Sequence, residues 1–216
     1  MTDIIYPDLE SAGRHLAAAL AKYRGTNSVV LAIANGGVPV AIPVASSLEA
    51  PLDLLIIRRL FIREARPFPI CAVSVGGDVV VDSESGPLSS IEEQFKHEAL
   101  HQLLARSHYL RGNLPAQNIA ARNIILVDNG IHTGSTLQIA ITALRTLQPQ
   151  SITVAVPVAD VSIKRNVESV AEEVVCLQWC DQFGHTGLWY RNFRRPSDEQ
   201  VRTIFLTCQR YQLAIE

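Results

Sequence analysis

The sequence has little net charge of either sign, since 19 Lys and Arg residues nearly balance 21 Asp and Glu residues in a chain of 216. A formal net charge of −2 gives no electrostatic reason to expect binding to nucleic acid or to an anionic membrane. A long apolar run is also missing, because Asn35-Gly36-Gly37, Pro39 and Pro43 interrupt the most apolar stretch, Val29 to Leu48. A membrane-spanning helix needs about 20 apolar residues in sequence, so we expect none.

The cysteines lack the spacing of a disulfide framework or a metal site. The four of them, Cys71, Cys176, Cys180 and Cys208, include no C-x-x-C pair. Isolated cysteines are typical of free thiols in a reducing compartment. The first ten residues, MTDIIYPDLE, also lack the basic and apolar segments of a secretory signal. We therefore expect a cytoplasmic protein.

Short apolar runs alternate with helical patterns along the chain, and no internal repeat is visible. Strands are expected at Ser28–Ala34, Leu52–Ile57, Asn123–Asp128, Ser151–Pro157 and Glu173–Leu177. Helices are expected at Leu9–Tyr23 with Ser11 as an early cap, Val38–Leu48 with Pro43 near its first turns, Leu88–Tyr109, Ser135–Leu147 and Val161–Ser169. This alternation predicts one α/β domain, residues 1–216, with a doubly wound, mainly parallel five-stranded sheet. Such sheets bind ligands beyond the carboxyl ends of their strands.

Two segments differ from this alternation. Phe61 to Pro87 is rich in Arg, Pro and Gly and contains a hairpin pattern from Ile70 to Val81, so we interpret it as an active-site flap. The tail, Phe183 to Glu216, ends in a helix that Ser197-Asp198-Glu199 begins with a good capping signal.

The turn within Val127 to Leu137 (VDNGIHTGSTL) has the composition of an anion site. Asp128 ends an apolar strand, and Gly130 and Gly134 allow positive φ and close backbone approach. Hydroxyl donors follow at Thr133, Ser135 and Thr136. The helix that starts there directs free N–H groups and the positive end of its dipole at the loop. A phosphate suits the loop and ribose hydroxyls suit Asp128, so a sugar phosphate satisfies both.

Other interpretations of this turn fit less well. An ordinary strand-to-helix turn with one cap residue is common, but it does not require two glycines, three hydroxyls and one acid within nine residues. A P-loop needs Gly-Lys-Ser/Thr, and a dinucleotide fingerprint needs G-x-G-x-x-G; both are absent here.

The segment Ile124 to Thr136 (IILVDNGIHTGST) resembles the phosphoribosyl pyrophosphate (PRPP) motif of type I phosphoribosyltransferases. The resemblance implies a 5′-phosphate loop made of Gly130, Ile131, Thr133, Gly134, Ser135 and Thr136. It implies that Asp128 binds the ribose hydroxyls. Asn129 stands at the position of a second acid, where it adds no negative charge. His132 stands where several members carry an acidic base; an acid–base role and an exposed loop histidine are both open.

The resemblance continues in Leu31 to Leu60, which is similar to the start of a subfamily of small predicted bacterial phosphoribosyltransferases. It implies a pyrophosphate loop at Asn35-Gly36-Gly37, with Asn35 in place of the usual Arg. Arg58 and Arg59 fit a basic pair that contacts phosphate, although solvated charge at a strand end explains them equally well. Gly187-Leu188-Trp189-Tyr190 also resembles this subfamily, and the tail is then expected to form part of a hood over the base site.

The implied reaction is displacement of pyrophosphate from PRPP by an unknown acceptor, often a nucleobase nitrogen. The resemblance implies Mg²⁺ bound through PRPP oxygens rather than in a direct protein metal site, and a homodimer. Asn129 and Asn35 keep an alternative open, a non-catalytic sensor or regulator that binds PRPP or a nucleotide on the same fold.

One further motif belongs to a different class of protein. His97-Glu98-Ala99-Leu100-His101 matches the H-E-x-x-H zinc-protease pattern, which places two histidines on one helix face. A third ligand is not apparent, because His108 lies one residue too far for the extended motif and Leu104 replaces its glycine. The surrounding residues are polar. We therefore expect a solvated helix face rather than a zinc site.

Overall fold

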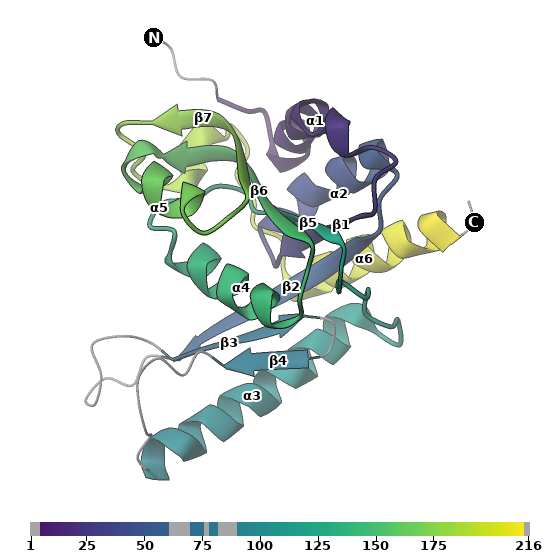
Figure 1. Cartoon of the computed structure of the whole chain (residues 1–216), viewed down its shortest axis with the longest axis vertical. Helices are drawn as coiled ribbons and strands as arrows, with labels where there is room; N and C mark the ends of the chain where they lie inside the picture. Colours follow the sequence, from purple (N-terminus) through teal and green to yellow (C-terminus); the bar gives the residue numbers. More distant parts are fainter. Residues whose placement is uncertain (1–4, 61–69, 76–77, 82–89, 214–216) are drawn as a thin grey trace.

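The computed structural model describes residues 5–60, 70–75, 78–81 and 90–213. The described strands form one seven-stranded sheet in the order β4-β3-β2-β1-β5-β6-β7 (Figure 1). They are β1 (Ser28–Ile33), β2 (Leu52–Leu60), β3 (Ile70–Val75), β4 (Asp78–Val81), β5 (Asn123–Val127), β6 (Ser151–Asp160) and β7 (Glu173–Cys180).

Five of these strands, β2, β1, β5, β6 and β7, run parallel, which confirms the predicted doubly wound α/β fold. The sheet is wider than the predicted five strands because β3 pairs antiparallel with β2, and β4 with β3. The chain leaves β1 toward β2 and returns to β5 on the other side of β1. The winding therefore reverses between β1 and β5, where open α/β sheets bind their ligands.

The α-helices cover both faces of the sheet (Figure 1). They are α1 (Leu9–Ala19), α2 (Gly37–Leu48), α3 (Ser90–Arg111), α4 (Ser135–Thr146), α5 (Lys164–Glu168) and α6 (Asp198–Leu213). Short 3₁₀ turns lie at Ala21–Tyr23, Val161–Ile163 and Thr186–Trp189. Alternate residues of β1 point to opposite faces: Val30 joins the core with α1, α2 and α6, and Leu31 joins the core with α4.

The structure corrects several predicted boundaries. The first helix is capped by Asp8, whose carboxylate accepts a hydrogen bond from the Ser11 backbone N–H at 2.7 Å, so Ser11 is not the cap. Pro43 lies inside α2 rather than in its first turns. The helix predicted at 161–169 is a 3₁₀ turn followed by the short α5, and β6 and β7 extend three residues beyond their predicted ends.

The last helix begins as predicted, with a reciprocal capping box. The Ser197 backbone N–H donates to Gln200 Oε1 at 2.9 Å, and the Gln200 backbone N–H donates to Ser197 Oγ at 3.2 Å. This cap fixes the point where the chain enters α6, directly after the segment 191–196 that approaches the carboxyl ends of the strands.

A buried ion pair ties α3 to the sheet. Arg111 bonds the carboxylate of Asp53 in β2, and its guanidinium also donates to the Leu54 carbonyl at 2.5 Å. The second carboxylate oxygen of Asp53 accepts from the Gln117 backbone N–H at 2.9 Å. Because both charges are buried with several hydrogen bonds, loss of either partner leaves an uncompensated charge in the core.

Two sequence predictions concern membrane contact and the flap. No helix in the described part of the chain is long and apolar enough to cross a membrane. The predicted hairpin, Ile70 to Val81, supplies β3 and β4 of the sheet. The rest of the predicted flap, 61–69, 76–77 and 82–87, lies outside the described residues, so the lid stays a prediction.

Candidate active site

The site is built where β1 and β5 end side by side, because each strand leads into one of the two predicted loops. Gly36 and Gly37 follow β1, and Asn129 follows β5. A Cβ atom on Gly36 would lie 2.4 Å from the Asn129 side-chain nitrogen, and one on Gly37 would lie 2.5 Å from the Val127 carbonyl oxygen. The two loops are therefore in direct contact: a side chain at residue 37 would meet backbone, and one at residue 36 would displace the Asn129 side chain.

The predicted phosphate loop has an open helix N-terminus. Gly134 is the N-cap of α4 at φ +72°, and no side chain caps the helix. The Thr133 and Ser135 hydroxyl oxygens lie 3.1 Å apart. Ile131 anchors the loop to the end of β6, since its N–H donates to the Val158 carbonyl and its carbonyl accepts from the Asp160 N–H. Unpaired helix amides and two hydroxyls together form an anion-binding arrangement.

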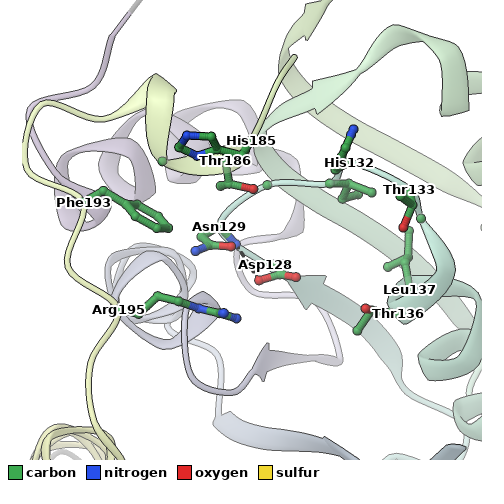
Figure 2. A pocket seen from close by; sticks show the side chains of 14 residues that line it. Asp128, Asn129, His132, Thr133, Thr136, Leu137, His185, Thr186, Phe193 and Arg195 are labelled. Carbon is green, nitrogen blue, oxygen red and sulfur yellow. Dashed lines mark hydrogen bonds between the residues drawn. The ribbon is translucent and has the colours of Figure 1, made fainter. Parts of the chain in front are cut away.

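A cavity of about 330 Å³ opens above these loops, a size within the range of small-molecule sites (Figure 2). One side of the cavity comes from the loop after β5, and the other comes from the tail. It is lined by Asp128, Asn129, Gly130, Ile131, His132, Thr133, Gly134, Thr136, Leu137, His185, Thr186, Gly187, Phe193 and Arg195.

Most of the predicted loop residues therefore line one cavity, but the other predicted residues do not. Ser135 is absent from the lining, as are Asn35, Gly36 and Gly37, although Gly36 contacts Asn129 beneath the floor. Arg58 is exposed on β2 and pairs in register with β3, away from the cavity lining. The side chain of Arg59 lies outside the described residues.

Asp128 is half-buried at the wall of the cavity. Burial raises the pKa of Asp128 to about 7, while the Asn129 backbone N–H at 2.7 Å and the charge of Arg195 act in the opposite direction. Near neutral pH the carboxyl therefore exists in both protonation states. A ligand that bonds the carboxylate form displaces a proton when it binds.

His132 lies at the rim of the cavity, with a side chain that is 54% exposed. Its ring stacks on Phe183 with centroids 5.5 Å apart. Its Nε2 atom is 3.9 Å from Oδ2 of Asp160, beyond hydrogen-bond distance but close enough for an electrostatic interaction. Asp160 is held in place by the Ser162 backbone N–H, which donates to its other oxygen at 2.8 Å. His132 is therefore an exposed residue at the cavity rim, and its acid–base role stays a prediction.

Sequence reasoning did not identify the tail side chains that complete the cavity. His185, Thr186, Phe193 and Arg195 come from the segment predicted to form a hood (Figure 2). Tyr190 anchors this segment to the site, because its buried hydroxyl donates to the Asn129 carbonyl at 2.6 Å. The resemblance of 187–190 to known tails pointed to the segment, but no local pattern indicated which side chains face the cavity.

Asn35 is turned away from the cavity and toward α3 and α6. Its side-chain nitrogen donates to the Pro196 carbonyl at 3.0 Å and to Asp198 Oδ1 at 2.8 Å. Arg106 donates to the Asn35 side-chain oxygen at 2.5 Å and bonds both oxygens of Asp198 at 2.8 Å. The peptide bond between Ala34 and Asn35 is cis. This side chain therefore holds the loop rather than facing a ligand.

The H-E-x-x-H pattern lies on the exposed surface of α3. His97, Glu98 and His101 are all exposed. Among the described residues, no group of three His, Cys, Asp or Glu side chains is arranged to hold a metal ion.

Comparison with known proteins places this chain in a known family. It belongs to the phosphoribosyl transferase domain family, whose model matches residues 2–189. Two Mycobacterium tuberculosis proteins, from strains CDC 1551 and H37Rv, carry the name "Putative phosphoribosyl transferase" and are 32% identical over 201 residues. That match covers 91% of this chain and 45% of each relative, so the chain spans about half the length of the curated relatives it matches.

A solved structure is similar along nearly the whole chain. The protein TT1426 from Thermus thermophilus matches with a TM-score of 0.80 and 30% sequence identity, covering 94% of this chain and 99% of that one. The family match confirms the resemblance to type I phosphoribosyltransferases that the loop after β5 indicated.

Proposed function

We propose that this protein binds PRPP and transfers its phosphoribosyl group to an acceptor, with release of pyrophosphate. One observation carries the proposal: the open N-terminus of α4 and the carboxyl of Asp128 face the same cavity. A sugar phosphate matches this pair, because the phosphate accepts amide and hydroxyl hydrogen bonds while the sugar hydroxyls donate to the carboxylate.

The proposed roles follow the two sides of the cavity. Thr133, Gly134 and Thr136 hold the 5′-phosphate, and Asp128 holds the ribose hydroxyls. The acceptor lies toward the tail, where Phe193 offers a flat apolar face, so a planar nitrogen heterocycle such as a nucleobase suits this side.

The proposed reaction is a substitution at the anomeric carbon. The bond from this carbon to the pyrophosphate oxygen breaks, and pyrophosphate leaves with the electron pair. A lone pair on the acceptor nitrogen forms the new bond, and the nitrogen then loses its proton to His132 or to water. The protein contributes by positioning the two reactants, by stabilising the departing charge and by excluding water.

The donor atoms of the cavity fit Mg²⁺ only in its substrate-bound mode. Asp128 is the one carboxylate among the residues that line it, and Mg²⁺ commonly uses one or two carboxylates together with substrate phosphates. PRPP oxygens would hold the ion, Asp128 would bind the ribose hydroxyls, and the ion would neutralise charge on the pyrophosphate. Because the pKa of Asp128 is about 7, we expect the affinity for PRPP to rise with pH through neutrality.

Calorimetry with PRPP and Mg²⁺ tests binding, and a pyrophosphate-release assay across purine and pyrimidine acceptors tests turnover. We expect binding at micromolar to millimolar PRPP and release with at least one acceptor. Absence of heat at millimolar PRPP would refute the proposed function. Asp128→Asn should weaken this binding, and Asp181→Asn is its matched control, since it changes an exposed carboxylate outside the cavity lining.

A second candidate, a non-catalytic sensor of PRPP or a nucleotide, is favoured by one observation: Asn129 occupies the position of the second acid beside Asp128. In this case PRPP binds and is protected without release of pyrophosphate. Pyrophosphate release by the wild-type protein distinguishes the two. If the wild type releases none, release restored in Asn129→Asp indicates an enzyme that has lost one carboxylate, and no release from the variant indicates a binding protein.

The family also implies a homodimer, and the isolated cysteines suggest a cytoplasmic location; both stay predictions. Light scattering after gel filtration tests the first, and cell fractionation tests the second.

A further inference from the structure

Arg195 is the one Lys or Arg among the residues that line the cavity. Its guanidinium extends from the tail toward Asp128 (Figure 2). Its charge also lowers the pKa of Asp128 against the larger effect of burial. The cavity is proposed to hold both a 5′-phosphate and a pyrophosphate. The question is therefore which of these two groups Arg195 binds.

The position of Arg195 relative to the two loops answers part of this question. Its neighbour Pro196 accepts a hydrogen bond from the Asn35 side chain at 3.0 Å, and Asp198 accepts a second at 2.8 Å. The tail is therefore bonded to the Asn35-Gly36-Gly37 loop one residue after Arg195. The 5′-phosphate loop, in contrast, lies on the other side of Asp128 (Figure 2).

Arg106 also lies beside the Asn35 loop, but its guanidinium is already paired with the Asp198 carboxylate. Three hydrogen bonds of 2.5 to 2.8 Å join it to Asp198 and Asn35. Arg195, in contrast, acts on Asp128 through its charge but makes no hydrogen bond or ion pair with any residue that the structure describes. Of these two cations, Arg195 is the one that is free to bind a ligand.

We propose that Arg195 binds the pyrophosphate group of PRPP and that Asn35 is the positioning residue that holds the tail for this contact. The inference rests on the proposed function of the cavity. The planar guanidinium donates two parallel hydrogen bonds to phosphate oxygens and opposes the charge that grows on pyrophosphate as it departs. The cation then comes from the tail rather than from the loop, where Asn35 stands in place of Arg.

The test compares Arg195→Gln with Arg194→Gln, a matched change of an exposed neighbour that does not line the cavity. Three ligands are titrated by calorimetry: Mg²⁺-pyrophosphate, Mg²⁺-PRPP and ribose 5-phosphate. We expect Arg195→Gln to weaken the first two roughly 10- to 100-fold, the range for hydrogen bonds to charged groups. Ribose 5-phosphate affinity should stay within about twofold, and Arg194→Gln should change none of the three.

The positioning role has its own readout. Asn35→Ala should weaken pyrophosphate affinity selectively, with ribose 5-phosphate affinity unchanged, because the tail loses two hydrogen bonds to the loop. A purely structural role would reduce both affinities together. Arg195→Lys keeps the charge without the planar fork and should recover part of the affinity.

Each outcome bears on a specific claim. Equal losses for pyrophosphate and ribose 5-phosphate, no loss for either, or an effect on acceptor KM alone would overturn the role of Arg195. The proposed function survives these results if the wild-type protein still binds PRPP. If the wild-type protein binds neither PRPP nor ribose 5-phosphate, both the proposed function and this inference fail.

Discussion

Replacement of Asp128 by Asn should make the protein more stable at neutral and alkaline pH. The carboxyl has a pKa of 3.8 in an unfolded chain and about 7 in the folded protein. Between these values the unfolded state is ionised while the folded state stays protonated, so the folded state binds more protons and loses stability as pH rises. The side-chain amide of the Asp128→Asn variant keeps an acceptor for the Asn129 N–H, which lies 2.7 Å from the carboxylate, and removes this dependence.

The magnitude follows from the shift. About three pKa units at about 1.4 kcal/mol each give about 4 kcal/mol of ionisation cost once the pH exceeds 7. At pH values well below 3.8 both states are protonated, and the cost is close to zero. For a domain of this size, about 4 kcal/mol corresponds to a rise of roughly 10 °C in melting temperature.

Urea unfolding of both proteins at pH 5, 6, 7 and 8 measures the effect. We expect the advantage of Asp128→Asn to grow with pH up to about 7 and then to level off. Asp160→Asn is the control with the opposite sign, because hydrogen bonds from Ser162 lower the pKa of Asp160. Its carboxylate contributes stability above the unfolded pKa, which is lost as pH falls through the folded pKa. A pH-independent difference for Asp128→Asn would refute the reasoning.

Three further substitutions test how the site is held. Arg111→Met should cost about 3–5 kcal/mol of unfolding free energy by leaving Asp53 charged and buried, and the double variant with Asp53→Leu should recover much of it in urea melts. Tyr190→Phe should cost about 1–3 kcal/mol, because the Asn129 carbonyl loses its 2.6 Å donor, and it should weaken ribose 5-phosphate binding in calorimetry. Gly37→Ala should cost about 1–3 kcal/mol in thermal melts, because its Cβ would lie 2.5 Å from a backbone oxygen; a neutral effect would show that the loops separate easily.

The sequence alone determined the parts of this protein that depend on local chain order. The five apolar runs became the five parallel strands. Nearly every residue of β1, β5 and β6 is buried, as continuous apolar runs in a parallel sheet require, whereas the edge strand β7 is mostly half-buried. The Thr133–Thr136 loop was identifiable because its glycines, its hydroxyls and the helix that follows are contiguous. Helix ends were less predictable: the choice between Asp8 and Ser11 as a cap depends on which of two nearby polar groups reaches the free amides.

Only the tertiary structure decided which distant side chains complete the site. Arg195 reaches a cavity formed by a loop more than fifty residues earlier in the chain, because Tyr190 and Asn35 bond the tail to the two strand ends. The raised pKa of Asp128 also depends on the tertiary structure, because surrounding elements bury its carboxyl. Local sequence determines the shape of one loop, whereas the charges that face a ligand depend on how separate elements pack around it.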